Sequence, residues 1–186
     1  MSRRSRFPQR KRIFLGCEGE SERSYGALLA RLVESQHQRI FLDTVLLQPG
    51  GGDPLALVLL AARRLREQES KRGAYVAAYL LVDADKLGNK PERDRQILAA
   101  ARKAGLNLIW QEPCHEGLLL RHLPGCEQLR PATTELAFAT LKQRWPGYEK
   151  NLPAAKLALV LGAEEVRRAR RVTDALDRLL KEMGFE

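Results

Sequence analysis

The sequence lacks long apolar segments and has little cysteine. No apolar run approaches the roughly 20 residues that span a bilayer, and the basic residues 1–12 precede no hydrophobic, cleavable segment of the kind found in secretory signals. The three cysteines, Cys17, Cys114 and Cys126, are odd in number and form no CxxC pair, which argues against a disulfide framework or a ribbon-type zinc site. We therefore expect a soluble, cytoplasmic protein with no membrane partner.

Positive charge is what the sequence has in excess. Lys and Arg number 32 against 23 Asp and Glu, which gives a formal net charge of +9 over 186 residues. This balance favours contact with polyanions such as nucleic acid, although charge does not determine the fold. At 44% hydrophobic residues, the chain is long enough for one well-buried core and short for two.

Basic residues concentrate in two segments. Residues 1–11 have almost no apolar side chains, so they are too polar to pack and are predicted to form a flexible arm. A second run lies in the last predicted helix, where the alternative is a solvated helix face balanced by nearby acids. The residues predicted to contact nucleic acid are Arg3, Arg4, Arg6, Arg10, Lys11, Arg12, Arg167, Arg168, Arg170 and Arg171.

Strand-like and helix-like segments alternate between residues 12 and 123. Short apolar runs bounded by turn residues predict strands, and apolar residues at helical spacing predict the helices between them. The predicted strands are 13–17, 40–47, 75–82 and 106–110. This alternation requires crossover connections and predicts an α/β fold, with a mainly parallel, Rossmann-like sheet of about four strands and helices on both faces.

The alternation stops after Pro113, and helical patterns follow one another. They are separated by proline and glycine residues, which interrupt helices. The predicted helices are 115–123, 133–144, 152–161 and 164–183. We expect residues 124–186 to form a helical extension packed on the α/β core of residues 12–123.

Acidic residues follow two of the predicted strands. Glu18 comes directly after the first strand, and Asp83 and Asp85 end the third. Functional groups of open parallel sheets collect at the carboxyl ends of strands, and the common strand order 2-1-3 would bring these acids together. Magnesium prefers such hard oxygen ligands. The same acids could instead complement a helix dipole or cap a turn, and spacing alone leaves both interpretations open.

A glycine-rich segment opens the second predicted helix. Residues 50–54 (GGGDP) could meet a phosphate through their backbone amides, but they lack the Lys-Ser/Thr of a nucleotide-binding P-loop. A plain flexible turn is the alternative.

Four motifs occur in the order found in a known family. Residues 14–25 (FLGCEGESERSY) resemble the CEG-x-x-E-x-x-Y opening of RloB-like proteins, a family of the wider Toprim-like group, and residues 82–85 (VDAD) are similar to its DxD strand end. Residues 112–123 (EPCHEGLLLRHL) are similar to its NPCFElWlLLHF segment, and residues 146–150 resemble a later Y-x-K element. The chain departs from this pattern at Glu112 and His115, where Asn and Phe are usual, and at Gly117, where an aromatic residue is usual.

The resemblance implies a Toprim-type parallel sheet used with Mg²⁺ or Mn²⁺ in phosphodiester chemistry. Glu18 would be the acid/base or a shared metal ligand, and Asp83 and Asp85 would be metal ligands. Glu22 matches a further family position, where it would help to orient the site.

Three further residues are secondary candidates. Glu116 and His122 lie in the third motif, and Lys150 lies in the fourth. The alternative for the third motif is a buried leucine face with Glu116 in the first helical turn for dipole reasons. The alternative for Lys150 is a solvated surface lysine.

The resemblance also implies a biological setting. RloB-like proteins are associated with restriction-modification and antiphage loci, often beside an ATPase. The predicted function is therefore a magnesium-dependent nuclease of a defence system, cutting DNA or RNA, tRNA included, with a partner ATPase. The alternative is a Toprim-like nucleic-acid-binding or regulatory subunit of that ATPase without cleavage of its own, against which the intact Glu18, Asp83 and Asp85 argue.

Overall fold

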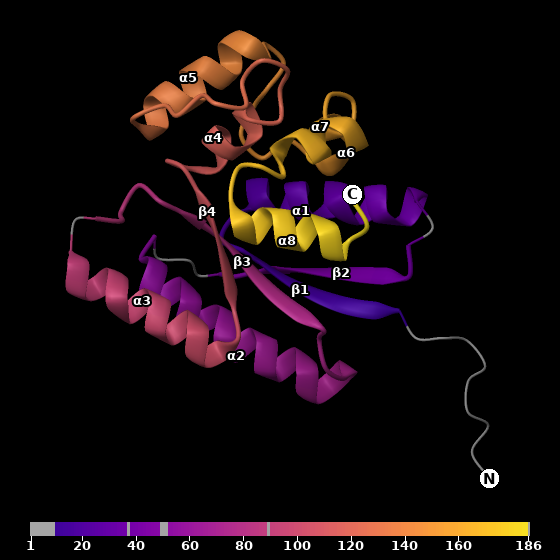
Figure 1. Cartoon of the computed structure of the whole chain (residues 1–186), viewed down its shortest axis with the longest axis vertical. Helices are drawn as coiled ribbons and strands as arrows, with labels where there is room; N and C mark the ends of the chain where they lie inside the picture. The colour runs from indigo at the N-terminus through magenta and orange to yellow at the C-terminus, as the bar shows by residue number, and fades with distance from the viewer. Residues whose placement is uncertain (1–9, 37, 49–51, 89, 186) are drawn as a thin grey trace.

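A single parallel sheet organises the computed structural model, which describes residues 10–36, 38–48, 52–88 and 90–185 (Figure 1). The strand order is β2-β1-β3-β4, and every pairing is parallel. The strands are β1 (Lys11–Cys17), β2 (Ile40–Leu46), β3 (Ala77–Asp83) and β4 (Asn107–Gln111). The predicted α/β fold is confirmed, and so is the expectation that the first and third strands are neighbours.

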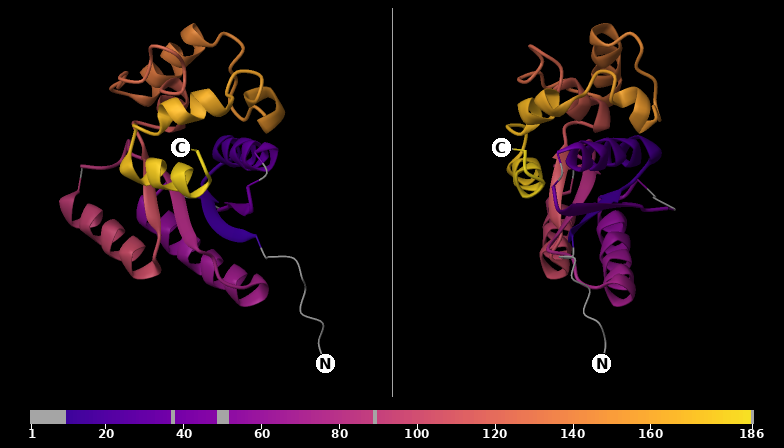
Figure 2. Two further views of the ribbon diagram at one scale, coloured as in Figure 1. Left: turned by 45° about the vertical axis from the view of Figure 1, so that its right-hand side comes forward. Right: turned by 90° about the vertical axis from the view of Figure 1, so that its right-hand side faces the viewer.

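Helices cover both faces of the sheet (Figure 2). Successive strand residues point to opposite faces, so Phe14 and Leu80 pack against one helical layer while Leu15 and Tyr79 pack against the other. The first layer contains α2 (Pro54–Arg72) and α3 (Pro91–Ala104), and the second begins with α1 (Glu20–Ser35). The two hydrophobic clusters therefore lie on either side of the sheet.

The C-terminal half completes the α1 layer. It contains α4 (His115–Leu120), α5 (Thr134–Arg144), α6 (Ala154–Leu157), α7 (Ala163–Ala169) and α8 (Asp174–Glu182). The apolar side of α8 shares one buried cluster with Tyr79, Leu81 and Ile109 of the sheet. No helix in the described ranges is long and apolar enough to cross a membrane.

Two predicted helices are shorter in the structure. The segment predicted as one helix over 164–183 forms α7 and α8, because the Thr173 side chain accepts a hydrogen bond from the Leu176 amide at 3.1 Å and begins a new helix. The helix predicted over 152–161 is reduced to α6.

The folded core begins at Lys11, one residue before the predicted boundary at residue 12. β1 starts there, and the Lys11 amide donates to the Arg39 carbonyl at 2.9 Å.

Candidate functional site

Four carboxylates meet at the carboxyl edge of the sheet. Glu18 directly follows β1 and Asp83 is the last residue of β3, so the pairing of these strands brings them to one edge. Asp85 lies in the turn after β3, and Glu22 comes from the first turn of α1. All four line one hollow of about 150 Å³, together with Gly52, Pro54 and Lys86.

Asp83 carries the strongest electrostatic perturbation of this hollow. Burial, followed by the charges of Glu22 and Glu18, raises the pKa of Asp83 to about 8. Its Oδ1 atom is buried without a hydrogen-bond partner among the described residues. A carboxylate held among like charges and without an internal partner is where a bound cation would lower the energy most.

Lys86 supplies the positive charge of the hollow. Burial and the Glu22 charge raise the pKa of Glu18, while the Lys86 charge lowers it. The Lys86 ammonium donates a hydrogen bond to the Gly52 carbonyl, which ties the turn after β3 to the loop before α2. No sequence motif marks this lysine, because its role depends on a contact 34 positions away.

These oxygen donors suit a hard divalent ion, but the side chains that carry them do not converge on one point. Within the described residues, no three acid, His or Cys side chains are close enough together to hold an ion as they are placed. Magnesium commonly takes only one or two carboxylates, with water and substrate phosphate completing the shell. The structure therefore brings Glu18, Asp83 and Asp85 to one hollow, and binding requires that their side chains turn towards a common point.

Glu22 and Glu116 support this hollow from buried positions. The Glu22 carboxylate accepts a hydrogen bond from the Gly19 amide at 3.1 Å, so it also caps α1. Glu116 accepts one from the Tyr148 hydroxyl at 3.2 Å and one from the Cys114 thiol at 3.2 Å. Both carboxylates help to raise the pKa of Asp83, Glu22 more than Glu116.

His122 and Lys150 do not line the hollow. The His122 ring is fully buried, with Nδ1 2.9 Å from the Leu118 carbonyl and Nε2 2.9 Å from the Tyr25 hydroxyl. Nδ1 therefore carries the proton and Nε2 accepts from Tyr25. Lys150 is exposed, with its ammonium 5.7 Å from the centre of the Phe138 ring. Of the secondary candidates, Glu22 lines the hollow, and Glu116 lies outside it but affects Asp83 through its charge. His122 and Lys150 do neither.

The N-terminal basic residues have different surroundings. Arg3, Arg4 and Arg6 lie outside the described residues, as do Gly50 and Gly51 of the glycine-rich segment, while Arg10 is exposed and Lys11 opens β1. Arg12 was predicted to contact nucleic acid, but its guanidinium bonds Asp43 at 3.1 Å and the Tyr75 hydroxyl at 2.7 Å. Its side chain is 15% exposed. The structure therefore gives Arg12 a structural role, because its donors are engaged within the fold, while its contact with nucleic acid stays a prediction.

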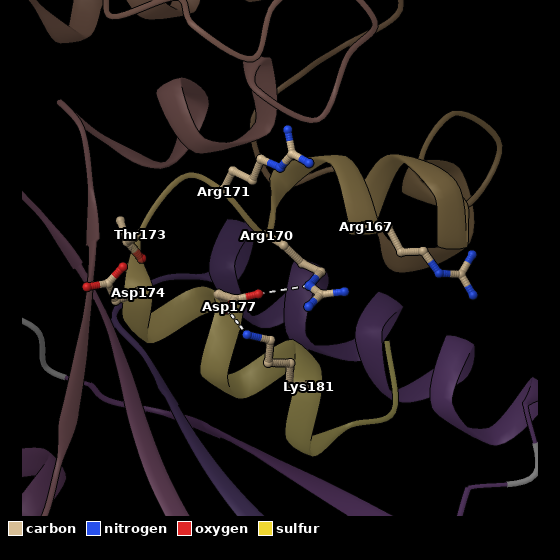
Figure 3. Close-up of a pocket in the computed structure, with 7 residues that line it drawn as sticks. All are labelled: Arg167, Arg170, Arg171, Thr173, Asp174, Asp177 and Lys181. Carbon is tan, nitrogen blue, oxygen red and sulfur yellow. Dashed lines mark hydrogen bonds and ion pairs between the residues drawn. The ribbon is translucent and has the colours of Figure 1, made fainter. Parts of the chain in front are cut away.

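The C-terminal arginine run divides into internal and open side chains. Arg168 forms ion pairs with three glutamates, and Arg170 is 2.8 Å from Asp177. Arg167 and Arg171 are exposed and point away from that pair at the edge of a pocket of about 470 Å³ (Figure 3). Arg167 and Arg171 therefore remain the candidates for contact with a polyanion, while Arg168 and Arg170 are engaged within the fold.

The fold and site define a Rossmann-like α/β protein with a carboxylate-lined hollow where two adjacent parallel strands end. The chain belongs to the RloB-like protein family, whose family model matches residues 13–179. This match contains all of the acidic residues of the hollow. Searches of the curated proteins and of the solved structures gave no match. The further likeness to Toprim domains stays a prediction.

Proposed function

We propose that this protein is a magnesium-dependent nuclease that cleaves phosphodiester bonds in DNA or RNA. The observation that carries the proposal is the hollow lined by Glu18, Glu22, Asp83 and Asp85. One buried oxygen of Asp83 there has no hydrogen-bond partner among the described residues. Acids gathered from β3, its following turn and the start of α1 form a donor set of the kind that holds hard cations.

Each residue of the hollow has a role in the proposed reaction. Asp83 and Asp85 hold the metal, and Glu18 either shares it or transfers a proton, as suits a carboxyl whose pKa is raised by burial. Glu22 fixes the start of α1 through the Gly19 amide and thereby orients Glu18. Bound Mg²⁺ or Mn²⁺ would supply Lewis-acid stabilisation of the phosphate and a more acidic water molecule.

The proposed setting follows from family membership and charge. RloB-like proteins are associated with restriction-modification and antiphage loci, often beside an ATPase, so we propose a defence role with a partner ATPase. The formal net charge of +9 favours a nucleic-acid substrate, tRNA included. Arg167 and Arg171 are exposed and would contact its phosphates.

A specific observation favours a second candidate function. No ready-made set of three ligands surrounds one point in the described part of the chain. A nucleic-acid-binding or regulatory subunit of the ATPase, without cleavage of its own, would need no such set.

The distinguishing experiment is a cleavage panel. Purified protein is incubated with DNA, total RNA and tRNA in Mg²⁺, in Mn²⁺ and in chelator, with and without a co-purifying ATPase. We expect cleavage of at least one substrate that chelator abolishes and that Glu18→Gln removes. Cleavage that persists in chelator, or in Glu18→Gln, would contradict the metal mechanism. Binding without any cleavage under all conditions would favour the regulatory subunit.

A further inference from the structure

A larger cleft lies beside the acidic hollow. This cleft has a volume of about 570 Å³ and shares Gly52, Pro54 and Lys86 with the hollow. Its volume lies within the roughly 300 to 1,000 Å³ of typical ligand sites. The two cavities are therefore neighbours with a common wall, and an extended ligand that reaches the carboxylates can also occupy the cleft.

The sign of the charge differs between the acidic hollow and the cleft. Of the acids in the cleft, Asp53 is 2.6 Å from the Arg93 guanidinium, and Asp94 accepts a hydrogen bond from the Gly88 amide at 3.0 Å. Lys86 bonds only a neutral carbonyl, and Lys90 is exposed with no ion-pair partner in the described ranges. The lining of the cleft therefore has three basic and two acidic side chains, and only Asp53 and Arg93 among them form an ion pair in the described ranges. The positive charges of Lys86 and Lys90 exceed the remaining negative charge of Asp94 and favour an anion.

The helices on either side reinforce this positive potential. The first turns of α2 and α3 both line the cleft, through Pro54 and Arg93. These helices have 19 and 14 residues, so each contributes partial positive charge at its N-terminus, which Asp53 at α2 and Glu92 and Asp94 at α3 partly offset. Their contribution adds to the lysine charges.

We propose that the cleft binds the sugar-phosphate backbone of a nucleic-acid strand, next to the phosphate that lies in the acidic hollow. This inference rests on the proposed nuclease function, because it places the neighbouring phosphates of the same substrate. Lys86 stands at the shared rim and neutralises both the carboxylates and the strand, and Lys90 contacts the strand further along. Five of the eight residues that line the cleft are charged, so we expect recognition of the backbone there, independent of sequence.

The test is a binding measurement in chelator, where the proposed cleavage cannot proceed. Fluorescence anisotropy of labelled single-stranded and duplex oligonucleotides compares the wild type with Lys86→Gln/Lys90→Gln. The matched control is Arg102→Gln/Lys103→Gln, which removes the same charge from exposed residues at the far end of α3. We expect about tenfold weaker binding for the cleft variant, and a salt slope smaller by about 1.4 for single strands or 1.8 for duplex. The control should change affinity less than twofold.

Lys90→Gln alone separates binding in the cleft from a disturbance of the acidic hollow, because Lys90 does not line the hollow. Its salt slope should fall by about half as much as that of the double variant, and it should melt like the wild type. Equal losses in the cleft and control variants, or no binding by the wild type, would overturn the cleft assignment. If the binding differences hold but Mg²⁺ produces no cleavage, the nuclease function fails and the cleft stands. If Mg²⁺ produces cleavage but the cleft variant binds as tightly as the wild type, the nuclease function stands and the cleft assignment fails.

Discussion

Asp83 lies at the end of a buried strand, where its charge is opposed by burial and by neighbouring acids. A residue that served only to cap a turn would have its oxygens paired with amides, whereas Oδ1 of Asp83 has no partner among the described residues. The cluster therefore costs stability when no cation is present. Functional sites commonly carry such a cost.

Replacing Asp83 should separate stability from metal binding. Asp83→Asn keeps the side-chain size and removes a carboxyl whose pKa of about 8 disfavours folding at neutral pH, so the melting temperature in chelator should stay level or rise there. Saturating Mg²⁺, at about 100 times its dissociation constant, should raise the wild-type melting temperature by roughly 5 to 10 °C and leave the variant nearly unchanged. A wild type without a magnesium shift, together with a variant that melts clearly lower, would assign Asp83 a structural role.

His122 should make the protein sensitive to acid. Its burial lowers the pKa of the imidazole to about 4 in the folded state, against about 6.5 in the unfolded chain. The unfolded state therefore takes up the proton first, and stability should fall by about 3 kcal/mol as the pH drops from 6.5 to 4. Urea unfolding across this range should show a shallower fall for His122→Gln than for the wild type. Parallel curves would mean that His122 is not the buried neutral group described here.

At the scale of the element, α4 is held close to the end of β4. A Cβ atom on Gly117 would lie 2.2 Å from the Glu112 carbonyl oxygen, which belongs to the backbone and cannot turn aside. The RloB-like motif usually has an aromatic residue at this position, and such a side chain would therefore require a different backbone path. This close approach explains why glycine follows the buried Glu116.

Gly117→Ala should consequently destabilise the fold by about 1 to 3 kcal/mol, the range of overpacking substitutions. Gly147→Ala is the matched control, because the nearest atom to its added Cβ would be 3.6 Å away, on Trp145. Chemical denaturation of both variants measures the difference. An alanine at 117 as stable as the alanine at 147 would show that the segment around Glu112 is free to move.

The elements differ in how far the sequence predicts them. The strands and their parallel order follow from apolar runs and crossover connections, and the convergence of Glu18 and Asp83 follows from that order. Thr173 interrupts a continuous helical pattern, because periodicity does not reveal a side chain that caps a helix. Sequence patterns do not reveal the internal contacts of Arg12 and Lys86, because their partners, Asp43 and Gly52, come from distant segments.

At the scale of the whole molecule, deleting the N-terminal basic segment tests how far its charge contributes to nucleic-acid binding without disturbing the fold. The deletion has to stop before Lys11, whose backbone begins β1. Removing residues 1–9 takes away Arg3, Arg4 and Arg6, and it should weaken nucleic-acid binding and reduce its salt slope by up to about 2 to 3. Melting curves should coincide with those of the full chain. An unchanged salt slope would assign binding to the lysine cleft and to Arg167 and Arg171.

The central claim is that the carboxylates of the hollow hold a divalent ion that is required for cleavage. Single-turnover cleavage in Mg²⁺, with whichever nucleic acid the panel identifies, tests it by comparing the wild type with Asp83→Asn. Glu135→Gln is the control, since it removes an exposed acid of α5 outside the hollow and the cleft. We predict that Asp83→Asn cuts at least about 100-fold more slowly, a loss of about 2.7 kcal/mol of transition-state stabilisation, while Glu135→Gln cuts at the wild-type rate. Equal rates for the wild type and Asp83→Asn would contradict the account.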